Sequence, residues 1–137
     1  MKRANVDNQG LVLREKIKDF FVDIMPRNSY DPCPIRDMLA PSLDKWSLFV
    51  IFNLGYNDIM RFNDMKRRID GISSRMLSTT LKKLESSDLI VRTVYAEVQP
   101  RVEYRLTELG AGFADKLIDM SDWFISAKGI KKKGSKV

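Results

Sequence analysis

The fold of this chain is decided by the stretch DGISSRMLSTTLKKLESSDLIVRTVYAEVQPRVEYRLTELG, which spans residues 70–110. In its first part, apolar side chains recur at helical spacing and share one side of a helix. These side chains are Ile72, Met76, Leu77, Leu81 and Leu84. The pair Asp70-Gly71 is typical of a turn, and Ser73 or Ser74 suits an N-cap because a hydroxyl accepts a hydrogen bond from an unpaired backbone amide. This part therefore predicts a turn followed by a helix over residues 73–85.

The second part of the stretch predicts a β-hairpin. Val102, Tyr104 and Leu106 alternate with polar residues, as in a half-buried strand. Residues 89–98 are rich in β-branched and aromatic side chains and are the expected partner strand. The connection at residues 99–101 should form the tip, with Arg at its end, because Pro cannot donate a hydrogen bond to a sheet. A turn, a helix and a basic hairpin in this order predict the recognition half of a winged helix-turn-helix.

The polar side of the predicted helix suits a DNA major groove. Hydroxyls reach phosphates or base edges at short range, and Arg can donate two hydrogen bonds to guanine. A further helix, expected over residues 61–69, would cross the DNA backbone. The candidate DNA contacts are Ser74, Arg75, Ser78, Thr79 and Lys82 in the groove, Ser73 at the start of the helix, and Lys66, Arg92 and Arg101 at the backbone. The alternative is that these polar faces are only solvated surface.

Ordered short motifs connect the chain to a known family. They are CPI at 33–35, DKW at 44–46, RFN at 61–63, GIS at 71–73, LSTTLKKLE at 77–85, LIVR at 89–92, PRVEYRLTELG at 100–110, and Trp123. In this order they resemble the HxlR-type winged-helix transcriptional regulators of bacteria and archaea, relatives of the MarR type. The family usually has Gly where this chain has Asp44 and Asp88, and we expect both departures to alter local turns only.

Composition limits the classes of function. The chain has 137 residues, 44% of them hydrophobic, which is enough for the core of one domain. A net charge of +6 and a pI near 9.5 favour nucleic acid or another anionic surface as partner. Because the chain has no His and one Cys, zinc fingers and His-based catalytic triads are excluded. We therefore expect a protein that is not an enzyme and uses no metal and no cofactor.

The predicted architecture is α+β, mainly α. Residues 11–127 should form a single winged helix-turn-helix domain with added N- and C-terminal dimerisation helices. Residues 1–10 should be disordered, and residues 128–137 should be a basic flexible tail. No apolar run approaches the roughly 20 residues that cross a bilayer, and the N-terminus lacks the apolar core of a signal peptide. We therefore expect a cytoplasmic protein without a membrane partner, and the family resemblance implies a prokaryotic one.

The two terminal helices, expected over residues 11–25 and 108–127, carry wide apolar stripes. Exposed apolar patches mark partner surfaces, so we expect a homodimer. The family resemblance implies the same pairing of the first and last long helices. The interface candidates are Phe20, Phe21, Ile24, Leu117, Met120, Trp123 and Phe124. The alternative for the first helix is packing onto its own core. Gly110 and Gly112 indicate either close packing or a hinge.

Cys33 is a candidate redox sensor. Pro34 suits the first position of a short helix, which places Cys33 at or next to the N-cap. Amide dipoles there lower the pKa of a thiol. The resemblance implies the same role, since some family members sense electrophiles or oxidants with a Cys at this position. The alternative is a small buried apolar residue.

These patterns and the resemblance together predict a sequence-specific DNA-binding transcriptional regulator. It would act as a homodimer on an inverted-repeat operator in double-stranded DNA. Half-sites would lie roughly 34–36 Å apart or a multiple of that distance. Three alternatives stay open for its control: an oxidant or electrophile that reacts with Cys33, a small ligand bound between the dimer helices, or no effector at all. The alternative function is a winged-helix protein–protein interaction module without specific DNA binding.

Overall fold

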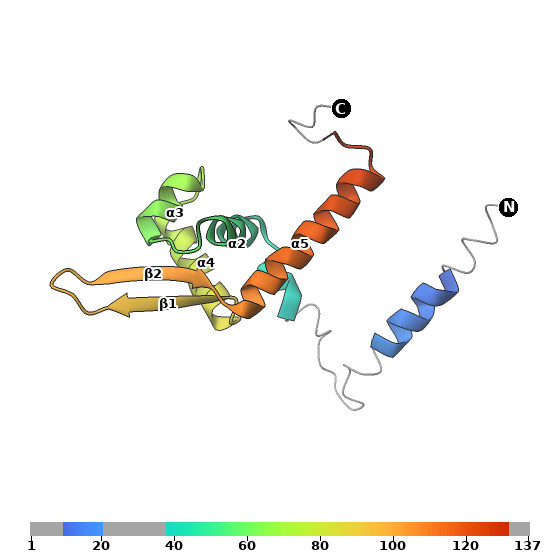
Figure 1. The fold of residues 1–137 in the computed structure, drawn as a ribbon, viewed down its shortest axis with the longest axis horizontal. Coiled ribbons are helices and arrows are strands. Elements are labelled where there is room, and N and C mark those ends of the chain that lie inside the picture. The colour runs from blue at the N-terminus through green and yellow to red at the C-terminus, as the bar shows by residue number, and fades with distance from the viewer. Residues whose placement is uncertain (1–9, 21–37, 132–137) are drawn as a thin grey trace. The chain divides into compact units, whose positions relative to one another are not determined.

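The computed structural model describes residues 10–20 and 38–131, in two units, Met1–Pro41 and Ser42–Val137 (Figure 1). In the first unit, residues 10–20 are helical and their side chains are exposed, in agreement with part of the predicted first helix. Phe21, Ile24 and Cys33 lie outside the described residues. Within the two described ranges, no helix has the length and apolar character needed to cross a membrane.

The second unit has the element order of a winged helix-turn-helix. Helices α3 and α4 follow one another after a short turn, and a hairpin connects α4 to a long last helix (Figure 1). The predicted fold class, α+β and mainly α, is confirmed. The elements are η2 at Ala40–Ser42, α2 at Lys45–Asn57, α3 at Phe62–Arg68, α4 at Ser74–Ser86, β1 at Ile90–Tyr95, β2 at Arg101–Leu106 and α5 at Glu108–Ala127.

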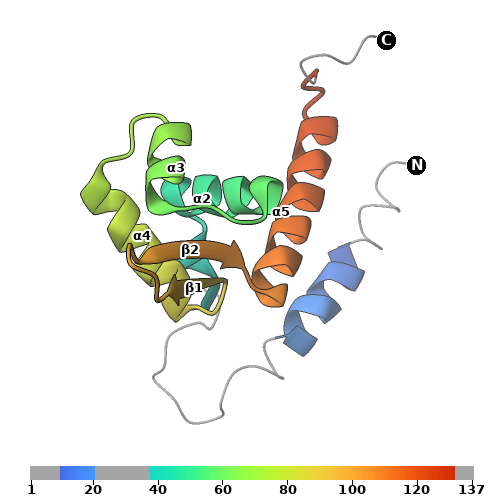
Figure 2. The same ribbon diagram turned by 60° about the vertical axis from the view of Figure 1, so that its left-hand side comes forward.

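Helix α2 is the centre of the core. It packs against α3, α4, α5 and β2, and both ribbon views place it between the α3–α4 pair and α5 (Figures 1 and 2). Its inward face consists of Val50, Ile51 and Leu54, each at most 1% exposed. The rest of the core is formed by Met60, Met65, Ile69, Ile72, Leu77, Leu81, Leu84, Leu89 and Ile90. The recognition half is therefore built directly onto one apolar helix.

Helix α4 begins at the predicted N-cap. The Ser73 hydroxyl accepts a hydrogen bond from the Met76 amide at 3.0 Å. The expected inward position of Met76 is wrong, because its side chain is 41% exposed. Thr80 is buried instead, together with Leu77, Leu81 and Leu84. At 3.6 residues per turn, these four side chains centre the buried face about a quarter turn away from Met76.

The end of α4 has a left-handed residue. Asp88 has a φ of 59°, and its amide donates to the Glu85 carbonyl, while the Leu89 amide donates to the Leu84 carbonyl, both at 3.0 Å. These two hydrogen bonds define a Schellman motif, whose left-handed position usually carries Gly. Asp88 thus adopts the backbone conformation that Gly usually takes at this position.

Replacing Asp88 with Gly should stabilise the chain by roughly 0.5–1 kcal/mol. A left-handed backbone costs about 1–2 kcal/mol for an L-residue, and the greater entropy of unfolded Gly offsets part of the gain. The hydrogen bonds around Asp88 use backbone atoms, including the carbonyl that accepts from the Thr107 hydroxyl, so they remain available. Urea unfolding at neutral pH would measure the change. A less stable variant would show that the Asp88 side chain makes a favourable contribution.

The hairpin is shorter than predicted on its first strand. Strand β1 ends at Tyr95 rather than near residue 98, because the Glu97 amide donates to the Tyr95 carbonyl and turns the chain. The two strands are antiparallel, with Ile90 opposite Leu106 and Tyr95 opposite Arg101. A reciprocal pair of backbone hydrogen bonds joins Met60 to Tyr104. The hairpin is therefore tied to the loop before α3 as well as to its own strands.

Helix α5 begins as predicted, with the Thr107 hydroxyl accepting from the Gly110 amide at 3.0 Å. Gly110 is buried, and a Cβ added there would lie 1.9 Å from the Leu89 carbonyl oxygen. A Cβ at Gly112 would meet nothing within 4 Å. Of the two interpretations left open by the sequence, the structure favours close packing at Gly110.

Candidate nucleic-acid interface

The outer face of α4 carries the predicted groove residues. It lies on the side of the helix opposite Leu77 and Leu81, which are buried in the core. Ser74, Arg75, Thr79 and Lys82 are exposed, and Ser78 is half-buried. The Ser73 hydroxyl already accepts a bond as the N-cap but keeps its own proton to donate. The structure therefore presents short hydroxyls and two long cations together on one accessible helical face.

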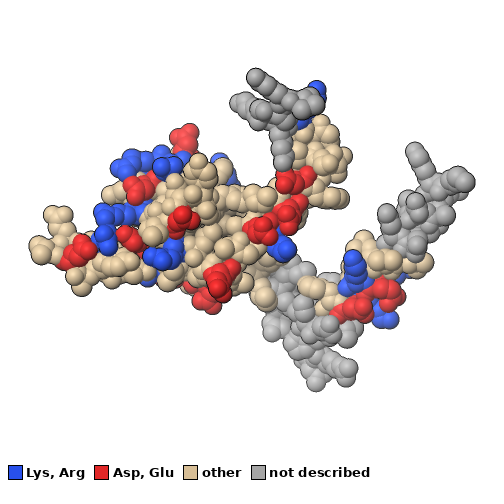
Figure 3. Space-filling model, in the orientation of Figure 1, with Lys and Arg blue, Asp and Glu red and all other residues tan. Residues whose placement is uncertain are grey.

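Helix α3 adds a basic last turn formed by Lys66, Arg67 and Arg68. In Figure 3, Lys and Arg side chains gather over α3 and along the hairpin, whereas Asp and Glu line α5. Lys66, the predicted backbone contact, is half-buried, and Arg67 is paired with Asp64. Cations also complement the negative end of the helix dipole at this position. Part of this positive charge therefore stabilises α3 itself.

A cleft of about 300 Å³ separates α4 from the hairpin. Its lining residues are Ser78, Leu81, Lys82, Glu85, Arg92 and Tyr104. Within the described part of the chain, neither Lys82 nor Arg92 has an ion-pair partner. The cleft thus brings together two free cations that are ten positions apart in sequence. Tyr104 was predicted only as an inward strand residue, since alternation cannot reveal a cleft.

Arg101 differs from the prediction for the hairpin tip. It is the first residue of β2, and the tip is formed by residues 96–100. Its guanidinium lies 3.1 Å from a Glu103 oxygen, 3.7 Å from a Glu97 oxygen and 4.4 Å from the centre of the Tyr95 ring. The expected basic tip is therefore wrong, because the cation is held by two carboxylates and an aromatic face on the hairpin itself.

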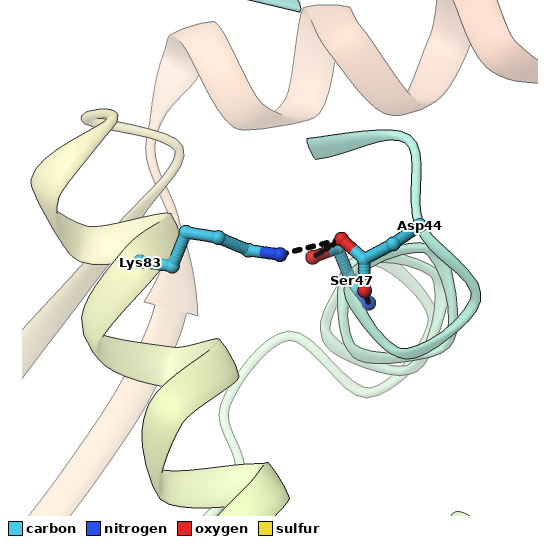
Figure 4. A network of polar contacts seen from close by, with 3 residues as sticks. All are labelled: Asp44, Ser47 and Lys83. Carbon is cyan, nitrogen blue, oxygen red and sulfur yellow. Dashed lines mark hydrogen bonds and ion pairs between the residues drawn. The ribbon is translucent and has the colours of Figure 1, made fainter. Parts of the chain in front are cut away.

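Asp44 does more than cap α2. One of its oxygens accepts hydrogen bonds from the Ser47 hydroxyl and from the Lys83 ammonium, both at 2.5 Å (Figure 4). The other oxygen accepts from the Ser47 amide at 3.2 Å. The expectation that this departure from the family alters only a local turn is wrong, because Lys83 belongs to α4, 39 positions away. Asp44 therefore links the start of the core helix to the recognition helix.

The charge of Asp44 should make stability depend on pH. Burial alone would raise the pKa of its carboxyl, but hydrogen bonds from Lys83 and Ser47 and the charge of Lys83 outweigh this and lower the pKa below 3.8. A lowered pKa stabilises the folded state above the unfolded pKa, and this contribution is lost as the pH falls through the folded value.

Asp44→Asn tests this dependence, since Asn caps a helix about as well as Asp. At pH 7 the variant should be less stable by about 0.2–1 kcal/mol, the range for exposed ion pairs, because both partners are more than a third exposed. The difference should shrink as the pH is lowered from 4 toward 3. Urea unfolding at several pH values would measure it, and a difference that stays constant would contradict the role of the charge.

A core helix, a recognition helix with a cationic outer face and a hairpin wing define a helix-turn-helix transcriptional regulator. Residues 43–131 match the model of the HxlR-like helix-turn-helix family, and the chain belongs to this family. The family comprises transcriptional regulators, which are not enzymes. The family expectation drawn from the ordered motifs is therefore confirmed.

Relatives and solved structures agree with this assignment. The chain is 37% identical over 102 residues to a protein of Fusobacterium mortiferum named as the regulatory protein MalR, covering 74% of this chain and 95% of that one. It resembles a structure named as a MarR-family transcriptional regulator from Enterococcus faecalis, with a TM-score of 0.65, 27% identity and coverages of 76% and 96%. It also resembles the structure of the redox regulator HypR in its reduced form, with a TM-score of 0.60 and 32% identity. The match covers 70% of this chain and 94% of that one.

Proposed function

We propose that this chain binds duplex DNA in a sequence-specific manner as a homodimer, on an inverted-repeat operator. The observation that carries this proposal is the juxtaposition of the exposed polar face of α4 with the cleft that holds Lys82 and Arg92. A helix of this width fits a major groove, and cations at its edge can neutralise the flanking phosphates.

The roles follow from position. Ser74, Arg75, Ser78, Thr79 and Lys82 would enter the groove, with Ser73 at the start of the helix donating to a phosphate. Arg92 and Lys66 would contact the backbone on either side and add affinity without sequence choice. Arg101 would reach a phosphate only after exchanging its contacts with Glu97 and Glu103, so we expect it to contribute less than Arg92.

A homodimer is supported by the outer surface of α5. Met120, Trp123 and Phe124 are 49%, 64% and 48% exposed, and the two aromatic rings meet edge to face at 5.0 Å. Clustered exposed aromatic side chains are typical of protein interfaces. Leu117 is only 7% exposed within the chain itself, so it would pack beneath the interface residues rather than contact the partner directly. Phe20, which is 40% exposed, would add to this interface, and Phe21 and Ile24 stay candidates from the sequence.

Selection of bound duplexes from a random pool, at about 0.15 M salt, tests the proposal. A palindromic consensus with half-sites one or more helical turns apart is expected for a two-fold dimer. A salt titration on the selected duplex then gives the number of neutralised phosphates. If no sequence is enriched and binding vanishes as salt rises, the positive charge is only a nonspecific field, and the proposal of sequence-specific binding is wrong. The protein-interaction module is then the alternative to test.

We also propose that an effector controls DNA binding. The name of the redox regulator HypR, which is 32% identical, supports an oxidant or electrophile with Cys33 as the sensor. A groove of about 670 Å³ between α2, β2 and α5 offers a site for a small ligand instead. Treatment with a thiol-alkylating reagent should weaken DNA binding of the wild type and not of Cys33→Ser. Equal responses would exclude Cys33 as the sensor and leave a small ligand or no effector.

A further inference from the structure

Lys83 lies on the polar side of α4 but differs from its neighbours in what it contacts. Its ammonium is 2.5 Å from the Asp44 carboxylate, and its side chain is 34% exposed, whereas Lys82 is exposed and has no ion pair among the described residues (Figure 4). A carboxylate this close cancels the positive charge and would repel a phosphate. Lys83 is therefore poorly suited to contact DNA.

Asp44 is a rigid anchor for this lysine. Ser47, which is fully buried, donates both its amide and its hydroxyl to the Asp44 carboxylate. These two bonds fix the carboxylate to the first turn of α2, the helix around which the core is built. If α4 rotated, the Lys83 ammonium would therefore move away from the Asp44 carboxylate, which is fixed to α2.

The lysine lies on the same stripe as the proposed groove residues. Arg75, Thr79 and Lys83 are spaced four positions apart, so they follow one another along one side of α4. The buried face of α4 packs through apolar contacts and one Thr, and such contacts have little directional preference. A charged hydrogen bond is directional and short. It can therefore add a directional constraint on the rotation of the helix to the one that the buried face already imposes.

We propose that the Asp44–Lys83 ion pair sets the rotation of α4 about its axis, and that Lys83 is a positioning residue for DNA recognition rather than a phosphate contact. This inference rests on the proposed DNA binding. Hydrogen bonds to base edges tolerate only a few tenths of an ångström. A small rotation would therefore weaken the bonds of Arg75 and Thr79 to bases while leaving phosphate contacts nearly intact.

The test is a double-mutant cycle in DNA binding with Asp44→Asn, Lys83→Met and the double variant. The dissociation constant is measured for the selected palindrome and for the same duplex with two changed base pairs per half-site, over a range of salt. Each single variant should lose roughly threefold to tenfold in affinity for the palindrome and less for the changed duplex. The double variant should bind no worse than either single one, and the salt slope should be unchanged.

Lys82→Met is the matched control, since it removes the same charge from the neighbouring position. Its effect should be the same in the wild type and in Asp44→Asn, because it does not contact Asp44. Unfolding free energies of all variants are measured in parallel, and binding is compared where each is fully folded. A merely structural role would lower stability without changing the discrimination between the two duplexes.

Two results would overturn the inference in different ways. If the wild type selects a palindrome but Lys83→Met lowers the salt slope by about one, and Asp44→Asn tightens binding, then Lys83 is a phosphate contact and only the positioning role fails. If the losses of affinity of the two single variants added up in the double variant, the two residues would not be coupled, and the positioning role would fail as well. If the wild type selects no sequence at all, the proposed function itself is wrong, and the positioning role fails with it.

Discussion

Replacing Gly110 with Ala is expected to destabilise the folded chain by about 3 kcal/mol or more, at the upper end of the range for overpacked cores. The added Cβ would lie 1.9 Å from the carbonyl oxygen and 2.9 Å from the carbonyl carbon of Leu89, and 3.2 Å from a methyl carbon of Leu106. The first two are backbone atoms, so no side-chain rotation can relieve the contact.

Two backbone hydrogen bonds of Leu89 fix the position of its carbonyl group. It accepts a hydrogen bond from the Thr107 amide at 3.1 Å, and the Leu89 amide closes the end of α4. Making room for a Cβ at Gly110 would therefore disturb both the end of α4 and the start of α5. Since α5 carries the proposed dimer surface, the variant should also weaken dimerisation.

Gly112→Ala is the control for Gly110→Ala, because it makes the same chemical change two positions along the same helix. Its Cβ would have open space, so the variant should gain roughly 0.5–1 kcal/mol from the higher helix propensity of Ala. Urea unfolding of both variants measures the difference. If the two changed stability equally, the close approach of Gly110 to Leu89 would not be the reason for Gly at that position.

Replacing Arg75 with Ala should raise the dissociation constant for the selected operator by about 10- to 150-fold, which corresponds to roughly 1–3 kcal/mol. Arg75 is exposed near the start of α4 and has no ion pair among the described residues, so its guanidinium is available to a base. Loss of a bidentate contact to guanine should also relax the choice of base at one position in each half-site. Titration against the operator and four single-base variants of it measures both effects.

Lys116→Ala serves as the control for Arg75→Ala. It removes one positive charge from an exposed position on α5 that is distant in sequence from the recognition helix. It should leave base preference unchanged. If Arg75→Ala weakened binding to every duplex by the same factor and reduced the salt slope by about one, Arg75 would contact a phosphate and another residue would read the base.

Local signals in the sequence predicted the elements of this fold well. The predicted N-cap Ser73 accepts from an amide three positions along the chain, and the structure shows Asp44 and Thr107 capping α2 and α5 in the same way. Helical spacing placed Leu77, Leu81 and Leu84 on the buried face of α4, and alternation placed Tyr104 and Leu106 on the inner side of the hairpin. These features depend on neighbours in sequence, so periodicity and capping residues reveal them.

The candidate site was predicted only in outline. Ser74, Arg75, Thr79 and Lys82 lie on an exposed face and Ser78 is half-buried, because a helix presents its polar side once its apolar side is known; their role in a groove stays a prediction. The expected tip position of Arg101 was wrong. A long cation pairs with whichever carboxylates the hairpin register brings within reach, and here these are Glu97 and Glu103. The dimer residues and Cys33 stay predictions.

The sequence by itself determined the family, the order of helices and strands, and which helix carries the polar face proposed to contact DNA, since these follow from local pattern and ordered motifs. Only the tertiary structure decided which of the described cations have a carboxylate partner. Lys83 and Lys82 are adjacent and chemically identical, yet one is bound to Asp44 and the other faces a cleft with Arg92. It also decided that Gly110 is required and Gly112 is not. Both distinctions depend on distances between segments far apart in the chain, which only packing sets.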